Sequence, residues 1–230
     1  MTLREVRDIA TTVAVPHHEP PALIRRRRIV VAVVLVIGAA LLGFSLTRRP
    51  GDSAFYWLTL ALAAVWTVGA FASGPLHLGC VRFRGRNQRP WITGTLVGVA
   101  VGGAFLVGGL VAREIPGVRE YVTRVLEFAD YGPLALVVFI TVINGVAEEL
   151  FFRGALYTAL GRTYPAVVST IIYIVTVLAT RNPMLAFAAV ILGAVCAYER
   201  RVTGGVLAPV LTHFFWGLIM VLALPPVFGV

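Results

Sequence analysis

The chain has 230 residues, of which 58% are hydrophobic and 13% charged, and it carries a formal net charge of +9. Together with a mean hydropathy of +0.86, this composition excludes an ordinary soluble domain and predicts an integral membrane protein. All 20 of its Lys and Arg residues are arginine, and most lie between apolar runs. Charges placed in this way set the orientation of membrane helices, so we expect the lipid bilayer as a partner and no binding of nucleic acid.

Residues 1–28 are mixed polar and contain several prolines around the pair His17-His18. We expect a flexible cytoplasmic tail here, because such a segment cannot bury enough apolar surface to fold. Two neighbouring histidines with no further ligand nearby do not make a metal site. The apolar run after residue 28 is too long for a signal peptide, so we expect residues 29–230 to form one membrane domain that begins with a retained span.

Seven apolar segments predict membrane-spanning helices, since a span needs about 20 residues. They are residues 29–47, 54–73, 91–112, 133–160, 165–180, 184–199 and 204–224. The segment 113–130 instead alternates charged and apolar residues and predicts a short helix on the surface. The expected fold class is therefore all-α, a polytopic membrane bundle of about seven transmembrane helices.

The arginines also predict which way these helices run. If the N-terminus lies inside, thirteen arginines are cytoplasmic and six are outside, which leaves Arg153 within the membrane region. This excess favours a cytoplasmic N-terminus. We expect an integral protein of the bacterial cell membrane.

The stretch VAEELFFRG, residues 146–154, places three charged groups inside an apolar segment. Charged side chains are costly within a membrane, so they mark a functional site. On an α-helix, Glu149 and Arg153 lie one turn apart and are expected to pair. Glu148 points about 100° away and shares its line with Asn144, so it is expected to be the free, reactive carboxylate, with Asn144 as a supporting residue.

His213 is the second candidate for a catalytic residue. Counting about 1.5 Å per residue, Glu148 lies roughly 22 Å from the outer end of its span, and His213 about 13 Å from the cytoplasmic start of the last span. The two side chains can therefore meet at a similar depth. Gly145 is expected to leave room beside the carboxylates for a water molecule or a substrate backbone.

The motif Glu148-Glu149-x-x-x-Arg153, followed two helices later by APVLTH ending at His213, resembles the CPBP family. This is a group of CAAX prenyl endopeptidases, abortive-infection proteins and bacteriocin-processing membrane proteins. The resemblance covers residues 130–225 and implies a similar helical core with intramembrane peptidase activity on a membrane-associated peptide or protein. It implies that Glu148 is the general base and that His213 helps to hold the oxyanion. Glu149 and Arg153 are then structural companions.

Two positions depart from the family's pattern. Its middle motif is a phenylalanine, three residues and a histidine, and the matching positions here are Tyr173 and Val177. Its last motif usually has an asparagine four residues after the histidine, where this chain has Gly217. Losing one oxyanion donor typically lowers a rate by about 10²–10³, so a weakened enzyme and a non-catalytic relative are both consistent with the sequence. The hydroxyls that could substitute as donors are those of Tyr173, Thr176, Tyr198 and Thr212.

Three functions therefore remain open at this stage. The first is a peptidase in which Glu148 activates water, and the second is a non-catalytic membrane protein that acts in binding, assembly or immunity. The third is a proton-coupled or cation-coupled transporter, since intramembrane carboxylates also relay protons. Against transport, no inverted repeat or pair of discontinuous helices is apparent.

No metal or other cofactor is expected for the peptidase, because water is the nucleophile. Glu148, Glu149 and His213 could supply oxygen and nitrogen ligands, but the sequence lacks an H-E-x-x-H motif, which disfavours zinc. Cys80 and Cys196 are far apart and have no metal-ligand spacing, so they indicate neither a zinc site nor a disulfide framework.

Overall fold

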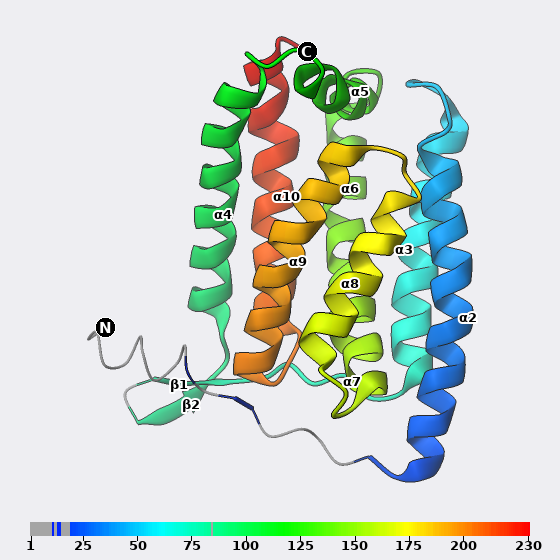
Figure 1. Ribbon diagram of the computed structural model, residues 1–230, viewed down its shortest axis with the longest axis vertical. Coiled ribbons are helices and arrows are strands. Elements are labelled where there is room, and N and C mark those ends of the chain that lie inside the picture. Colours follow the sequence, from blue (N-terminus) through cyan, green and yellow to red (C-terminus); the bar gives the residue numbers. More distant parts are fainter. Residues whose placement is uncertain (1–10, 12, 15–18, 84) are drawn as a thin grey trace.

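Within the described residues, six helices are long and apolar enough to cross a membrane. The computed structural model describes every residue except 1–10, 12, 15–18 and 84 (Figure 1). The six are α2 (Pro21–Ser45), α3 (Ser53–Ser73), α4 (Trp91–Ala112), the continuous segment Leu134–Leu160, α9 (Pro183–Thr203) and α10 (Leu207–Phe228). The segment Leu134–Leu160 comprises α6 (Leu134–Glu149), the π-helix η1 (Leu150–Leu156) and α7 (Tyr157–Leu160). The predicted fold class, an all-α membrane bundle, is confirmed.

The fifth predicted span, residues 165–180, is the short helix α8 (Pro165–Leu178), which has 14 residues. At about 1.5 Å per residue it is roughly 21 Å long, which is less than the hydrocarbon layer of about 30 Å. It packs against α9 (Figure 1), and its opposite face carries the exposed side chains of Val167, Ile171 and Val175. The number of full-length spans in the described chain is therefore six, and α8 accompanies them as a shorter apolar helix.

The helical part begins earlier than expected, because α2 starts at Pro21 and not at residue 29. Arg27 gives the reason. Its buried guanidinium donates hydrogen bonds to Glu19 Oε2 and to Ser73 Oγ, each at 2.9 Å, and to the Pro75 carbonyl at 3.0 Å. A buried charge needs such partners, and they fix the first turns of α2 to the end of α3. The predicted pair His17-His18 lies outside the described residues.

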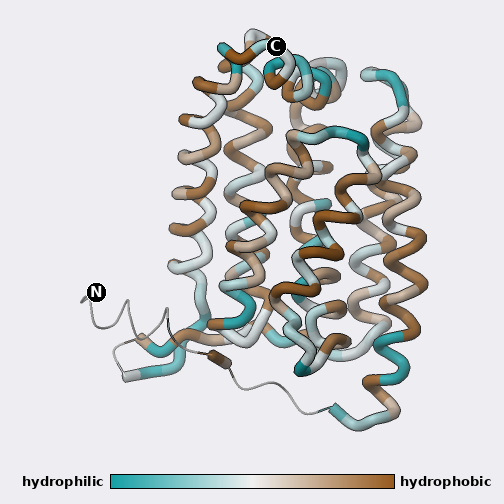
Figure 2. Tube along the Cα trace, viewed as in Figure 1, coloured by the Kyte–Doolittle hydropathy of each residue, from teal (hydrophilic) through white to brown (hydrophobic). Residues whose placement is uncertain are grey.

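The polar parts of the chain gather at the two ends of the bundle, and apolar residues fill the length between them (Figure 2). At one end lie the start of α2, the α7–α8 connection and a hairpin of β1 (Val81–Phe83) and β2 (Arg86–Gln88) (Figure 1). We call this the arginine-rich end, because Arg25 to Arg28, Arg82, Arg86, Arg89 and Arg162 belong to it. The separation is consistent with the predicted arginine asymmetry, and the cytoplasmic N-terminus stays a prediction.

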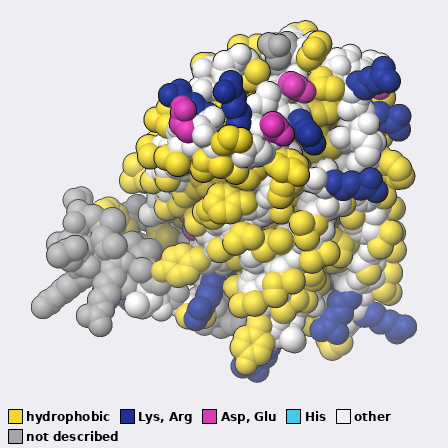
Figure 3. All heavy atoms as spheres, turned by 45° about the horizontal axis from the view of Figure 1, so that its top comes forward, with side chains coloured by type: hydrophobic (Ala, Val, Ile, Leu, Met, Phe, Trp, Pro, Cys, Tyr) yellow, Lys and Arg dark blue, Asp and Glu magenta, His cyan; other side chains and the backbone are white. Residues whose placement is uncertain are grey.

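The opposite end carries α5 (Val118–Asp130), which lies across the bundle beside the C-terminus (Figure 1). Charged side chains of both signs gather at this end, above an apolar flank (Figure 3). The predicted surface helix is thus present, but it begins five residues later than residue 113. Gly117 has a φ of 83°, in the left-handed region, and this residue changes the direction of the backbone between Pro116 and the start of α5.

A row of glycines brings α4 into close contact with α10. Gly94, Gly98 and Gly102 are spaced four residues apart and face α10, so the two backbones approach closely. A Cβ atom at Gly98 would lie 2.7 Å from the Thr212 carbonyl oxygen. The Thr212 hydroxyl also donates a 3.0 Å hydrogen bond to the Gly94 carbonyl. This contact fixes the height and rotation of the helix turn that carries His213.

We expect Gly98→Ala to lower the free energy of unfolding by about 1–3 kcal/mol, because the added methyl group forces α4 and α10 apart. Gly103→Ala is the matched control, since a Cβ atom at Gly103 would meet nothing within 4 Å. The measurement is the thermal midpoint of the purified protein in detergent micelles. Equal midpoints for the two variants would contradict the close packing of α4 on α10.

A hydrophobic cluster of buried side chains includes residues of α2, α3 and the segment that follows the two glutamates. The Trp66 ring of α3 is 1% exposed and lies 4.4 Å from the Phe151 ring and 5.2 Å from the Phe152 ring, between centroids. Phe151 and Phe152 are two of the three residues between Glu149 and Arg153. Their burial immobilises the turn from which the charged side chains project.

Candidate active site

The two glutamates lie where an α-helix changes into a π-helix. The amide of Leu150 still bonds to the Val146 carbonyl, four residues back, whereas that of Tyr157 reaches the Phe152 carbonyl, five residues back. A prediction at 100° per residue treats this segment as a continuous α-helix, so the π-helix is a correction. Single π-turns are rare and occur frequently at functional sites.

Glu149 forms the centre of a buried group of three charged or ionisable side chains. Its Oε1 atom accepts hydrogen bonds from Arg153 Nη1 at 3.1 Å and from His213 Nδ1 at 2.9 Å. Arg153 also donates from Nη2 to the Gly193 carbonyl at 3.0 Å. Glu149 and Arg153 are both 0% exposed. The predicted pair of Glu149 and Arg153 is therefore present, and it joins α6, η1, α9 and α10.

Glu148 has a different partner and a different environment. Its Oε2 atom accepts a 2.8 Å hydrogen bond from the Tyr173 hydroxyl of α8. The Glu148 side chain is partly exposed, in contrast to that of Glu149. This bond engages Oε2 and leaves Oε1 for a further donor such as water.

His213 approaches the glutamates across Gly145. A Cβ atom at Gly145 would lie 2.8 Å from His213 Cδ2 and 3.2 Å from Nε2, so a larger residue would push the imidazole away. The ring is 7% exposed and its Nδ1 is engaged by Glu149. The predicted meeting of α6 and α10 at one depth is observed, but the partner of His213 in the structure is Glu149 and not Glu148.

Asn144 was expected to support Glu148, and its amide is turned elsewhere. Asn144 Nδ2 donates a 2.9 Å hydrogen bond to the Ile140 carbonyl of its own helix. Its Oδ1 atom is buried and has no hydrogen-bond partner among the described residues. The structure therefore shows no contact through which Asn144 would hold Glu148.

The part of the chain that carries these residues matches a known family. The family model described as Type II CAAX prenyl endopeptidase Rce1-like matches residues 130–219. We call residues 130–219, which are similar to this family, the Rce1-like domain. The resemblance predicted for residues 130–225 is thus confirmed over nearly the same segment. No curated protein and no solved structure matches the chain.

The Rce1-like domain extends from the end of α5 through α6, η1, α7, α8 and α9 into α10. It therefore includes both glutamates, Arg153, Tyr173 and His213. Helices α2, α3 and α4 lie outside the matched residues. Helices α2 and α3 pack against Phe151 and Phe152 in the cluster around Trp66, and α4 packs against α10 through its glycines.

The two positions that depart from the family's pattern differ in their surroundings. Val177 is 8% exposed and belongs to the apolar core, one turn after Tyr173 on α8. Gly217 is buried one turn after His213, and a Cβ atom there would have only Thr141 Cγ2, at 3.6 Å, within 4 Å. A side chain at position 217 would therefore fit toward α6 without displacing the backbone.

Two of the hydroxyls considered as substitute donors are bonded to backbone carbonyls away from the carboxylates. Thr176 donates to the Ile172 carbonyl and Thr212 to the Gly94 carbonyl, and Tyr198 is 47% exposed on α9. The Tyr173 hydroxyl donates a hydrogen bond to Glu148. It reaches the proposed base itself and not a position where an oxyanion donor is expected.

Arg200 is a site residue that the sequence prediction missed. We predicted a loop charge, because the sixth span was expected to end at residue 199, but α9 continues to Thr203. Arg200 is 7% exposed, and its Nε donates a 2.7 Å hydrogen bond to the Arg153 carbonyl. The π-helix leaves this carbonyl without the Tyr157 amide as donor, so Arg200 stabilises the π-helical turn beneath Glu149.

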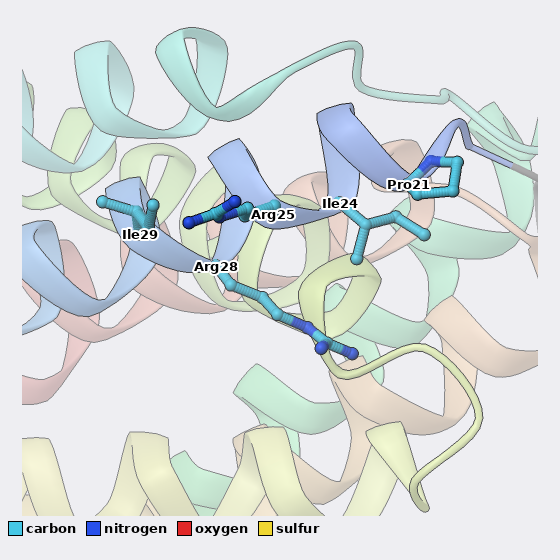
Figure 4. A pocket seen from close by; sticks show the side chains of 5 residues that line it. All are labelled: Pro21, Ile24, Arg25, Arg28 and Ile29. Carbon is cyan, nitrogen blue, oxygen red and sulfur yellow. The ribbon is translucent and has the colours of Figure 1, made fainter.

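No metal site accompanies these residues in the described part of the chain, where no three His, Cys, Asp or Glu side chains are grouped as ligands. Glu149 and His213, which could each bind a metal, are instead bonded to each other. A pocket of about 640 Å³ lies elsewhere, at the start of α2 (Figure 4). It is lined by Pro21, Ile24, Arg25, Arg28 and Ile29, and none of these belongs to the carboxylate site.

Proposed function

We propose that the chain is an intramembrane peptidase of the Rce1-like kind, in which Glu148 activates water to hydrolyse a peptide bond. The observation that carries the proposal is the division between two adjacent glutamates. Glu149 is buried and bonded to Arg153 and His213, whereas Glu148 is partly exposed and keeps one oxygen for a further donor. Two carboxylates in contrasting environments are suited to different roles, one structural and one reactive.

The proposed reaction uses these residues as follows. The water oxygen attacks the carbonyl carbon, and one water proton passes to Glu148 Oε1. The C–N bond then breaks as Glu148 returns that proton to the leaving nitrogen, which yields a carboxylic acid and an amine. The developing charge on the carbonyl oxygen needs a donor, and His213 Nε2 is proposed for that role.

The bond between His213 and Glu149 defines the protonation state that this role requires. If Nδ1 donates to an ionised Glu149 across their 2.9 Å contact, a donor role of Nε2 requires a proton on both ring nitrogens. Two carboxylates, the guanidinium of Arg153 and a protonated His213 then sum to zero charge. A balanced group costs less in a membrane than any state with a net charge.

The experiment uses the purified full chain in liposomes and quenched fluorogenic peptides of three kinds. One kind is soluble, one is anchored by an apolar segment, and one is anchored by a prenyl group on a C-terminal cysteine. We expect cleavage of anchored peptides, with mass spectrometry locating the bond. A difference between the two anchors would define the substrate class. No cleavage of any anchored peptide by correctly folded protein would overturn the proposal.

A second candidate, a non-catalytic role in binding or assembly, is favoured by one observation. Val177 packs into the apolar core where a histidine is expected from the family's motif. If this candidate is correct, the Glu148→Gln variant will support the protein's cellular role as well as the wild type does. Loss of that role with normal membrane abundance of the variant would favour the peptidase.

A further inference from the structure

The middle motif of the Rce1-like domain has its polar group one turn earlier than the family's pattern predicts. The pattern of phenylalanine, three residues and histidine corresponds here to Tyr173 and Val177. Residues four apart lie on the same face of a helix, so both side chains of α8 point toward the same part of the bundle. Both are buried, with 5% and 8% exposure.

Contacts with neighbouring side chains fix the orientation of the Tyr173 ring and therefore the direction of its hydroxyl. The guanidinium carbon of Arg153 lies over the ring, 4.7 Å from its centroid. The Phe152 ring meets it edge to face with centroids 4.9 Å apart. Gly193 of α9 leaves space beside it, since a Cβ atom there would lie 3.2 Å from Tyr173 Cδ1. The same arginine that pairs with Glu149 thus also orients the residue that bonds to Glu148.

We propose that Tyr173 is the positioning residue for Glu148 and that it takes the place of the histidine absent at position 177. This inference rests on the proposed peptidase function. By donating to Oε2 at 2.8 Å, the hydroxyl fixes the carboxylate so that Oε1 remains available to the attacking water. Tyr173 keeps its own proton throughout, and the proton that moves is exchanged between water, Glu148 Oε1 and the leaving nitrogen.

Tyr173→Phe tests the role of this hydroxyl with little other change. Phenylalanine keeps the ring, and with it the contacts to Arg153 and Phe152. We expect kcat for an anchored fluorogenic peptide to fall by about 10–10²-fold, the effect of losing one hydrogen bond to a charged group. KM and the thermal midpoint should stay unchanged. Tyr164→Phe is the matched control, because Tyr164 is 79% exposed just before α8.

A rescue separates positioning of Glu148 from a structural role of the hydroxyl. The double variant Tyr173→Phe with Val177→His rebuilds the family's motif, so it should recover at least part of the lost kcat. Val177→His alone should change kcat little, because Tyr173 already holds Glu148. A fold defect would not be repaired by a histidine one turn away.

The outcomes distinguish this inference from the proposed function. If the wild type is active and Tyr173→Phe is equally active, the inference is wrong and the peptidase stands. The inference is also wrong if kcat falls and Val177→His fails to restore any of it. If the wild type itself shows no Glu148-dependent cleavage, both the function and the inference are overturned.

Discussion

Removal of either partner of the buried pair, by Glu149→Ala or Arg153→Ala, is expected to lower the free energy of unfolding by about 3–5 kcal/mol. Each change leaves an uncompensated charge at a position with 0% exposure. In Arg153→Ala the Gly193 carbonyl also loses one of its donors, and in Glu149→Ala the Nδ1 atom of His213 loses its acceptor. The measurement is the folded yield and the thermal midpoint in detergent micelles.

The control for this prediction is the exposed pair of Arg113 and Glu114. Its nitrogen and oxygen atoms lie 2.8 Å apart, close to the separation in the buried pair, but the side chains are 42% and 71% exposed. Glu114→Ala should therefore cost no more than about 1 kcal/mol. A loss of stability in Glu149→Ala as small as that in Glu114→Ala would show that the buried pair is not structural.

Gly217→Asn is expected to increase the rate of peptide hydrolysis by about 10–10²-fold. The amide would lie one turn after His213 and could supply a second donor to the oxyanion, where single donors are worth about 10²–10³. The space exists, since the nearest atom to a Cβ at Gly217 is Thr141 Cγ2 at 3.6 Å. We place the expected gain below the full value because the new side chain has no partner to hold its rotamer.

Gly217→Leu is the matched control, since leucine fills a similar volume and has no donor. Its rate should equal that of the wild type or fall below it. A gain in both variants would mean that filling the space, and not hydrogen bonding, raises the rate. The gain in Gly217→Asn must also disappear when Glu148→Gln is added, because both steps belong to one reaction.

The sequence was sufficient to predict the membrane bundle, the pair of Glu149 and Arg153, and the segment that matches the Rce1-like family. These features depend on local signals, namely apolar runs of span length and a spacing of four residues. The length of α8 was less predictable, because a largely apolar helix of 14 residues followed by Ala179 and Thr180 resembles a short span.

The contacts between helices could not be read from the sequence. The sequence pattern Glu149-x-x-x-Arg153 does not reveal whether the backbone between the two residues is an α-helix or a π-helix. No local signal therefore predicts η1 at Leu150–Leu156. The bond of His213 to Glu149 depends on how α10 is rotated against α4, which the glycine row determines. Arg200 was assigned to a loop because charge usually ends a span, whereas here it satisfies a carbonyl that the π-helix releases.

The measurement that tests the central claim most directly is the hydrolysis rate of the Glu148→Gln variant. Glutamine keeps the size of the side chain and can still accept the Tyr173 hydrogen bond, but it cannot take a proton from water. Wild type and variant should be compared in liposomes at equal amounts of folded protein, with an anchored fluorogenic peptide. We predict a loss of at least about 10²-fold in kcat with an unchanged thermal midpoint. A variant that hydrolyses the peptide at the wild-type rate would contradict the assignment of Glu148 as the base.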